Sequence, residues 1–118
     1  DFISKKYQVS ITAAILRFIA LGNHPVMLVC SRNNKVVWRR FSDDFPFYTI
    51  LPGPGDTVPV NTAAGEYFLD RRKYTQTQTV FAEDWFLLRQ SRDRGRKFSE
   101  HCIYYEPLQQ VVSVLWEA

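Results

Sequence analysis

Side chains that bind metals or act as nucleophiles are scarce in this chain of 118 residues, which has only 2 histidines and 2 cysteines. It has no HExxH and no CxxC motif, the spacings that mark many zinc sites. The candidate ligands that remain are His24, His101, Cys30 and Cys102. His101 and Cys102 are neighbours on a predicted strand, so their side chains point to opposite faces and are poorly placed to share an ion. We expect no metal site and no cofactor.

Long apolar runs are also lacking. No stretch approaches the roughly 18 uninterrupted apolar residues of a membrane span, and no basic start followed by an apolar run marks a signal peptide. The 2 cysteines do not form the dense pattern of a small secreted disulfide scaffold. We therefore expect a cytoplasmic protein with reduced core thiols and no membrane partner. Because the first residue is Asp1 and not Met, we also expect a longer parent protein.

Apolar and aromatic residues are plentiful, at 46% and 15% of the chain, which is enough for the core of one compact domain. The net charge is +3, with basic residues concentrated at 71–73 and 89–97. Such clusters could contact phosphate, but a solvated turn is the commoner explanation. Charge alone therefore does not indicate a nucleic-acid partner.

The first 23 residues have the pattern of two helices joined by a short turn, as in a helix-turn-helix. In the second of these helices the apolar residues recur at helical spacing: Ile11, Ala14, Ile15 and Phe18. Ser10 is placed to cap it, and Gly22 and Pro25 end it. We predict a helix-turn-helix remnant over residues 1–23 and a separate domain over residues 24–118.

The pattern after residue 23 predicts an α+β domain. Apolar runs at 26–31 and 36–42 flank an Asn-rich turn, which indicates a hairpin. A helix over 63–72, capped by Asn61 or Thr62, follows a long loop, and strands are predicted at 79–88, 97–105 and 109–116. In the last of these, Val112, Val114 and Trp116 alternate with residues of the other face. The expected fold is an antiparallel sheet of about five strands with a covering helix, preceded by the helical hairpin.

The loop at 43–59 contains four of the chain's 6 prolines. A loop of this length in a small domain is usually a binding lid or a wrap over the core, so a ligand pocket between sheet, helix and loop is one hypothesis. The adjacent carboxylates Asp43 and Asp44, and Glu83 and Asp84, do not suggest acid/base catalysis, because neighbours on a strand diverge and neighbours in a loop face solvent. No catalytic residue is predicted.

Two specific activities remain as alternatives. A thiol enzyme would use Cys102 with His24 or His101, but a buried, inert cysteine is favoured. A DNA-binding module would present Ser10, Thr12 and Arg17 to base edges and Lys5 and Lys6 to phosphates. Because the second helix is mostly apolar, packing or homodimer formation is the favoured use of this helical pair.

The order of motifs resembles the C-terminal region of the ImmA/IrrE family of metallopeptidase-like regulators. Residues 6–22 read KYQVSITAAILRFIALG, similar to a family segment FxVSxxAAxxRxxxLG. Residues 36–42 followed by Phe45 and Pro46 are similar to the family stretch W...S..FP, and residues 80–85 and 100–116 to its ending, which closes on VSVLW. The likeness extends over nearly the whole chain.

This resemblance implies that an upstream peptidase domain carries HExxH and its zinc ligands. None of those positions exists in this chain, so no peptidase residue is carried over. The resemblance leaves the end of a helix-turn-helix and a GAF- or PAS-like domain, a type used to sense small molecules or to contact proteins. The implied function is non-catalytic regulation of transcription, with a small-molecule signal, the parent peptidase domain or its target repressor as partner.

Overall fold

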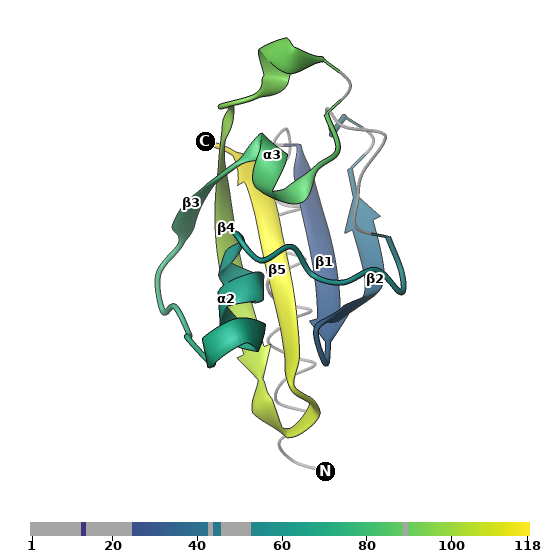
Figure 1. The fold of residues 1–118 in the computed structure, drawn as a ribbon, viewed down its shortest axis with the longest axis vertical. Helices are drawn as coiled ribbons and strands as arrows, with labels where there is room; N and C mark the ends of the chain where they lie inside the picture. Colours follow the sequence, from purple (N-terminus) through teal and green to yellow (C-terminus); the bar gives the residue numbers. More distant parts are fainter. Residues whose placement is uncertain (1–12, 14–24, 43, 46–52, 89) are drawn as a thin grey trace.

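The described part of the chain contains five β-strands and two α-helices (Figure 1). The computed structural model describes residues 13, 25–42, 44, 45, 53–88 and 90–118. Along this part of the chain the elements are β1 (Val26–Arg32), β2 (Lys35–Phe41), α2 (Ala63–Asp70), β3 (Gln78–Phe81), α3 (Ala82–Trp85), β4 (Lys97–Tyr105) and β5 (Gln110–Glu117). Short 3-10 helices at Ser91–Asp93 and Glu106–Leu108 precede β4 and β5. Neither described α-helix has the length and apolar character to cross a bilayer.

All five strands belong to one antiparallel sheet with the order β2-β1-β5-β4-β3. A tight turn joins β1 to β2, and its two residues, Asn33 and Asn34, have φ angles of 53° and 65°. Asparagine is among the few residues that adopt this left-handed conformation readily, which explains the Asn-rich hairpin. β5 lies in the centre of the sheet, between β1 and β4. The predicted α+β fold with about five antiparallel strands is confirmed.

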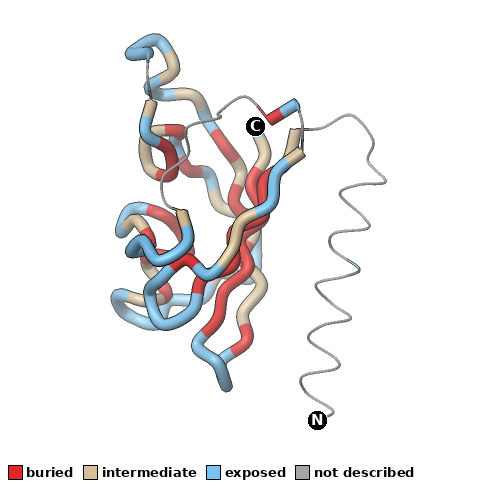
Figure 2. The backbone as a smooth tube through the Cα atoms, turned by 90° about the vertical axis from the view of Figure 1, so that its right-hand side faces the viewer, coloured by how far each residue is buried: buried red, intermediate tan, exposed pale blue. Residues whose placement is uncertain are grey.

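The two faces of the sheet carry separate apolar clusters. On the first face, Tyr67 of α2 and Trp85 of α3 pack with buried residues of the strands. The second face buries four strand residues: Leu28, Cys30, Val112 and Val114. Both described α-helices lie on the first face (Figure 1), and buried residues follow the central strands (Figure 2). The predicted alternation in the last strand is confirmed, because Val112, Val114 and Trp116 all belong to the second face.

Helix α2 begins at a side-chain cap and ends two residues before the predicted limit. The Gly65 amide donates to Thr62 Oγ1 at 2.9 Å, so Thr62 is the cap of the two candidates. Arg71 adopts the left-handed conformation with φ of 63°, and this ends the helix after Asp70. Gly65 is required by a close approach, because a Cβ there would lie 2.1 Å from the Pro59 carbonyl oxygen.

The strand predicted at 79–88 is wrong beyond residue 81. β3 ends at Phe81, and the chain turns into the four-residue helix α3. The Asp84 carboxylate accepts the Phe81 amide at 2.9 Å, and the Phe86 amide donates to the Ala82 carbonyl at 2.8 Å. The apolar run that suggests a strand therefore turns inward, and Trp85 and Phe86 are buried.

The predicted N-terminal helical hairpin is not tested. Of residues 1–23, only Ala13 is among the described residues. The DNA-contact residues proposed from the sequence lie outside them: Lys5, Lys6, Ser10, Thr12 and Arg17. DNA binding through this segment stays a prediction, as does the domain boundary at residues 23 and 24.

Candidate functional site

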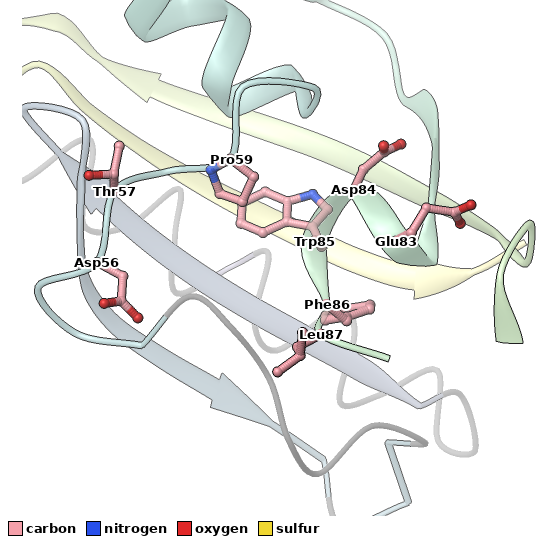
Figure 3. Close-up of a pocket in the computed structure, with 8 residues that line it drawn as sticks. All are labelled: Asp56, Thr57, Pro59, Glu83, Asp84, Trp85, Phe86 and Leu87. Carbon is pink, nitrogen blue, oxygen red and sulfur yellow. The ribbon is translucent and has the colours of Figure 1, made fainter. Parts of the chain in front are cut away.

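A groove of about 380 Å³ separates the loop after Gly53 from helix α3. We call it the α3 groove. It is lined by eight residues, Asp56, Thr57, Pro59, Glu83, Asp84, Trp85, Phe86 and Leu87 (Figure 3). The first three come from the loop, and the other five from α3 and the residues that follow it. The hypothesis of a pocket beside the long loop is thus supported, although α3 and not α2 forms the opposite wall.

The loop wall is held against the edge of β2. The Val36 amide donates to the Asp56 carbonyl at 2.9 Å, and the Gly55 amide donates to the Val36 carbonyl at 2.8 Å. Asp56 also closes its own turn, since its carboxylate accepts the Gly53 amide at 2.8 Å. Lys35 Nζ donates to Thr57 Oγ1 at 2.8 Å. These bonds fix the positions of Asp56 and Thr57 on one side of the groove.

The α3 wall is held by two carboxylates that accept backbone amides. Asp84 accepts Phe81 N–H at 2.9 Å, and Glu83 accepts Gly95 N–H at 2.9 Å. The Gly95 hydrogen bond is the main reason why the pKa of Glu83 is lowered, and the charge of Arg94 lowers it further. Figure 3 shows both carboxylates projecting from α3 away from Leu87, while Asp56 stands on the opposite wall. Both α3 carboxylates thus point away from Asp56 as well and serve to hold the α3 wall in place.

Trp85 connects the groove to the interior. Its side chain lines the groove but is only 2% exposed, and its indole Nε1–H donates to Glu100 Oε1 at 3.1 Å. The same carboxylate accepts the Ala63 amide at 2.8 Å and the Ala64 amide at 3.1 Å. A single buried side chain thus links the floor of the groove to the first turn of α2.

Glu100 is fully buried on β4. Burial raises the pKa of its carboxyl group, while the hydrogen bonds from Ala63, Trp85 and Ala64 act in the opposite direction. Cys102 Sγ lies 3.3 Å from Glu100 Oε2 and completes the set of donors. Four donors converge on this carboxylate, two from α2, one from α3 and one from β4 itself, which makes it a structural centre of the domain.

The candidate residues for thiol and metal chemistry are not brought together. Cys30 and Cys102 are both free and buried, as predicted. Burial raises the pKa of Cys30 to about 11 and raises that of Cys102 well above its ordinary value, which disfavours the reactive thiolate. His101 is half-buried on β4 beside Thr77, and His24 is outside the described residues. Within the described part of the chain, no three His, Cys, Asp or Glu side chains group as metal ligands.

The basic clusters contact neighbouring protein groups. Arg71 donates to Gln109 Oε1 at 2.8 Å, and Lys73 forms an ion pair with Glu106. Arg96 bonds Asp93 at 3.1 Å and Glu117 at 2.5 Å. These contacts favour the interpretation that the basic clusters are solvated turns, rather than a patch that binds phosphate.

Sequence reasoning missed the α3 wall and Glu100. The predicted strand at 79–88 makes Glu83 and Asp84 diverge, whereas in the structure both line the groove from a helix. The signal for α3 is the pair of acidic residues after Ala82, which is typical of a first helical turn. The signal for Glu100 is its place between Phe98 and Cys102 on the inward face of β4, where a charged residue is unusual.

Comparisons with protein-family models, with curated proteins and with solved structures each found no significant match.

Proposed function

We propose that this chain is a non-catalytic sensing or regulatory domain, and that its signal or partner binds in the α3 groove. The observation that carries the proposal is the groove itself, whose apolar floor is anchored to the core through Trp85 and Glu100. The polar lining groups, Asp56, Thr57, Glu83 and Asp84, all form hydrogen bonds that build the walls. This suits a preformed binding surface better than acid/base catalysis.

The proposed context is a regulator of the ImmA/IrrE type. The motif order in residues 6–22, 36–46 and 80–116 supports it, and a five-stranded antiparallel sheet with helices on one face is the coarse architecture of a GAF- or PAS-like domain. In this context the domain influences a cytoplasmic zinc peptidase that acts on a transcriptional repressor.

The family context is tested by the coding sequence upstream of Asp1. An HExxH motif there supports the proposal, and its absence contradicts the family assignment but leaves groove binding open. Cleavage of a repressor by the purified 118-residue chain would contradict the non-catalytic role.

The regulatory role is tested in a chain that includes the peptidase. Leu87 in the groove and Leu69 on α2 are 60% and 73% exposed, so a Glu is tolerated at either position. We expect Leu87→Glu to change the rate of repressor cleavage at least about fivefold, because a charge is placed on the apolar part of the groove. Leu69→Glu is the matched control and should leave the rate unchanged. Equal rates for both variants, with equal zinc content, would contradict regulation through the groove.

A further inference from the structure

The second face of the sheet carries an apolar cluster in which every described residue lies on a strand. Its buried members, each at most 9% exposed, are Leu28, Cys30, Val112 and Val114. The half-buried side chains packed against them are Val26, Trp38, Ile103 and Trp116. An apolar sheet face is stable in water only when a second layer packs on it. The position of this cluster therefore calls for a covering element.

The described helices do not supply this cover, because α2 and α3 both belong to the cluster of the first face. The segment 46–52 is also a poor candidate. It follows Phe45, which packs in the first-face cluster, and it leads to Gly53, whose turn is held at the edge of β2. The segment before Pro25 instead leads directly into Val26, a member of the second-face cluster.

The sequence before Pro25 contains an apolar stripe that suits this face. It consists of Ile11, Ala14, Ile15 and Phe18, which recur at helical spacing. Ala13 is the one described residue of this segment, and it is helical and exposed. At about 100° per residue, the stripe lies roughly 100° to 200° around the helix from Ala13. An exposed Ala13 is therefore what burial of the stripe predicts.

The connection and the length also fit. Gly22 ends the predicted helix, and only residues 23–25 separate it from β1. A helix and a strand joined by so short a loop are usually neighbours in space. From Ile11 to Phe18 a helix rises by about 10 Å, close to the roughly 13 Å that separate Val26 and Cys30 along a strand.

We infer that the second face of the sheet is the docking surface for residues 11–22 of the same chain, which cover it as an amphipathic helix. These residues then belong to the folded domain, and the predicted boundary between residues 23 and 24 falls inside it. The inference is independent of the proposed function, because α3, which forms one wall of the α3 groove, packs on the first face.

The first experiment looks for the contact in the unmodified full chain. Methyl NOEs in NMR report side chains that are in near contact, and isotope filtering of a mixture of labelled and unlabelled chains separates contacts within one chain from contacts between two. We expect NOEs within one chain from the Ile15 methyl groups to those of Val112 or Val114. The Ala13 methyl group is the control and should show none to these strand residues.

The second experiment uses the two thiols as reporters, because Cys30 lies in the second-face cluster and Cys102 in the first. Alkylation by iodoacetamide is followed at each thiol by mass spectrometry. We expect Ile15→Asp to speed alkylation of Cys30 at least about tenfold and that of Cys102 less than about twofold, because the cover is loosened locally. Ala13→Asp is the matched control and should leave both rates unchanged, although it sacrifices more helix propensity.

Each outcome decides the inference. NOEs from the stripe to the second face of another copy alone would overturn a cover within one chain in favour of a dimer. Absence of these NOEs, or equal protection of Cys30 in Ile15→Asp and Ala13→Asp, would also overturn it. If Ile15→Asp exposes both thiols and Ala13→Asp exposes neither, the stripe is part of the core of the domain, which supports the inference. The α3 groove is tested separately by Leu87→Glu.

Discussion

A carboxylate at position 100 occupies a place in the core where an apolar side chain is usual. Glu100 is tolerated there because two helix N-terminal amides, an indole N–H and a thiol point at its oxygens. The amides of Ala63 and Ala64 are among those that no carbonyl within α2 can satisfy. Glu100 therefore acts as a second cap of α2, beside Thr62, and simultaneously fixes Trp85.

The pH dependence of stability reports on Glu100. Burial raises its pKa in the folded protein above the ordinary 4.5, so the folded state holds this proton to a higher pH than the unfolded state does. Its contribution to the free energy of unfolding is then fully present below pH 4.5 and is lost as pH rises through the raised pKa. Glu100→Gln cannot titrate. We therefore expect the stability difference between wild type and Glu100→Gln to fall as the pH rises from 4.5 to 7.5.

The free energy of unfolding of both proteins is measured with urea at a series of pH values. Groups that titrate in the same way in both proteins do not contribute to the difference between them. An advantage of the wild type that grew with pH would mean that the four donors outweigh burial and lower the pKa of Glu100. The experiment therefore decides which of the two effects dominates.

The burial and the face of a single residue are predictable from the sequence only where the local residue pattern determines them. The burial of Cys30 and Cys102 and the alternation of Val112 and Val114 follow from strand periodicity, and both were predicted correctly. The role of Glu100 is not predictable in this way. Strand periodicity shows that Glu100 points to the inward face of β4, but it does not show which helix terminus lies over that face. That information comes from the packing of α2, which is distant in sequence.

At the scale of the elements, α2 makes a close backbone contact with the loop that precedes it. At Gly65 the helix passes so close to Pro59 that a Cβ would lie 2.1 Å from the carbonyl oxygen of that residue. Alanine is the better helix former by about 1 kcal/mol, so propensity alone predicts that Gly65→Ala stabilises the protein.

We expect Gly65→Ala to destabilise the protein by about 2 kcal/mol, because the clash involves backbone atoms that cannot rotate away. Leu69→Ala is a control on the exposed side of the same helix and should change stability by less than about 0.5 kcal/mol. The free energy of unfolding is measured by chemical denaturation. A gain in stability for Gly65→Ala would show that α2 can shift away from Pro59 at no cost.

The elements that were predicted correctly are those with strong local signals. The β1–β2 hairpin follows from its Asn-rich turn, and α2 follows from its cap and ends only two residues before the predicted limit. Helix α3 was missed because it is four residues long and its cap position is Phe81, which has no capping side chain. Its stability depends on Gly95 and Glu100, which contact Glu83 and Trp85 from other parts of the fold.

At the scale of the whole molecule, the second face of the sheet needs a cover. Its four residues Leu28, Cys30, Val112 and Val114 are buried, although both described helices pack on the first face. The segment before Pro25 carries the apolar stripe that begins at Ile11, and burial of such a stripe against the sheet would stabilise both.

We expect a chain shortened to residues 25–118, which lacks the apolar stripe, to unfold at a lower denaturant concentration than the full chain and to bind the dye ANS. Fluorescence of the dye and urea unfolding of the two chains, measured side by side, test this. Equal stability without dye binding would mean that residues 24–118 form a self-sufficient domain, as the predicted boundary implies.

The central place of β5 has a consequence for biosynthesis. β1 pairs with β5, with Val26 opposite Trp116, so the inner edge of β1 has no partner in the sheet until residues 110–117 have left the ribosome. During translation the β1–β2 hairpin presents an unpaired apolar edge, and such edges invite pairing with other nascent chains. Of the five described strands, β5 is made last and joins the two halves of the sheet, so the interval before it emerges is when these strands are most open to aggregation and to chaperones.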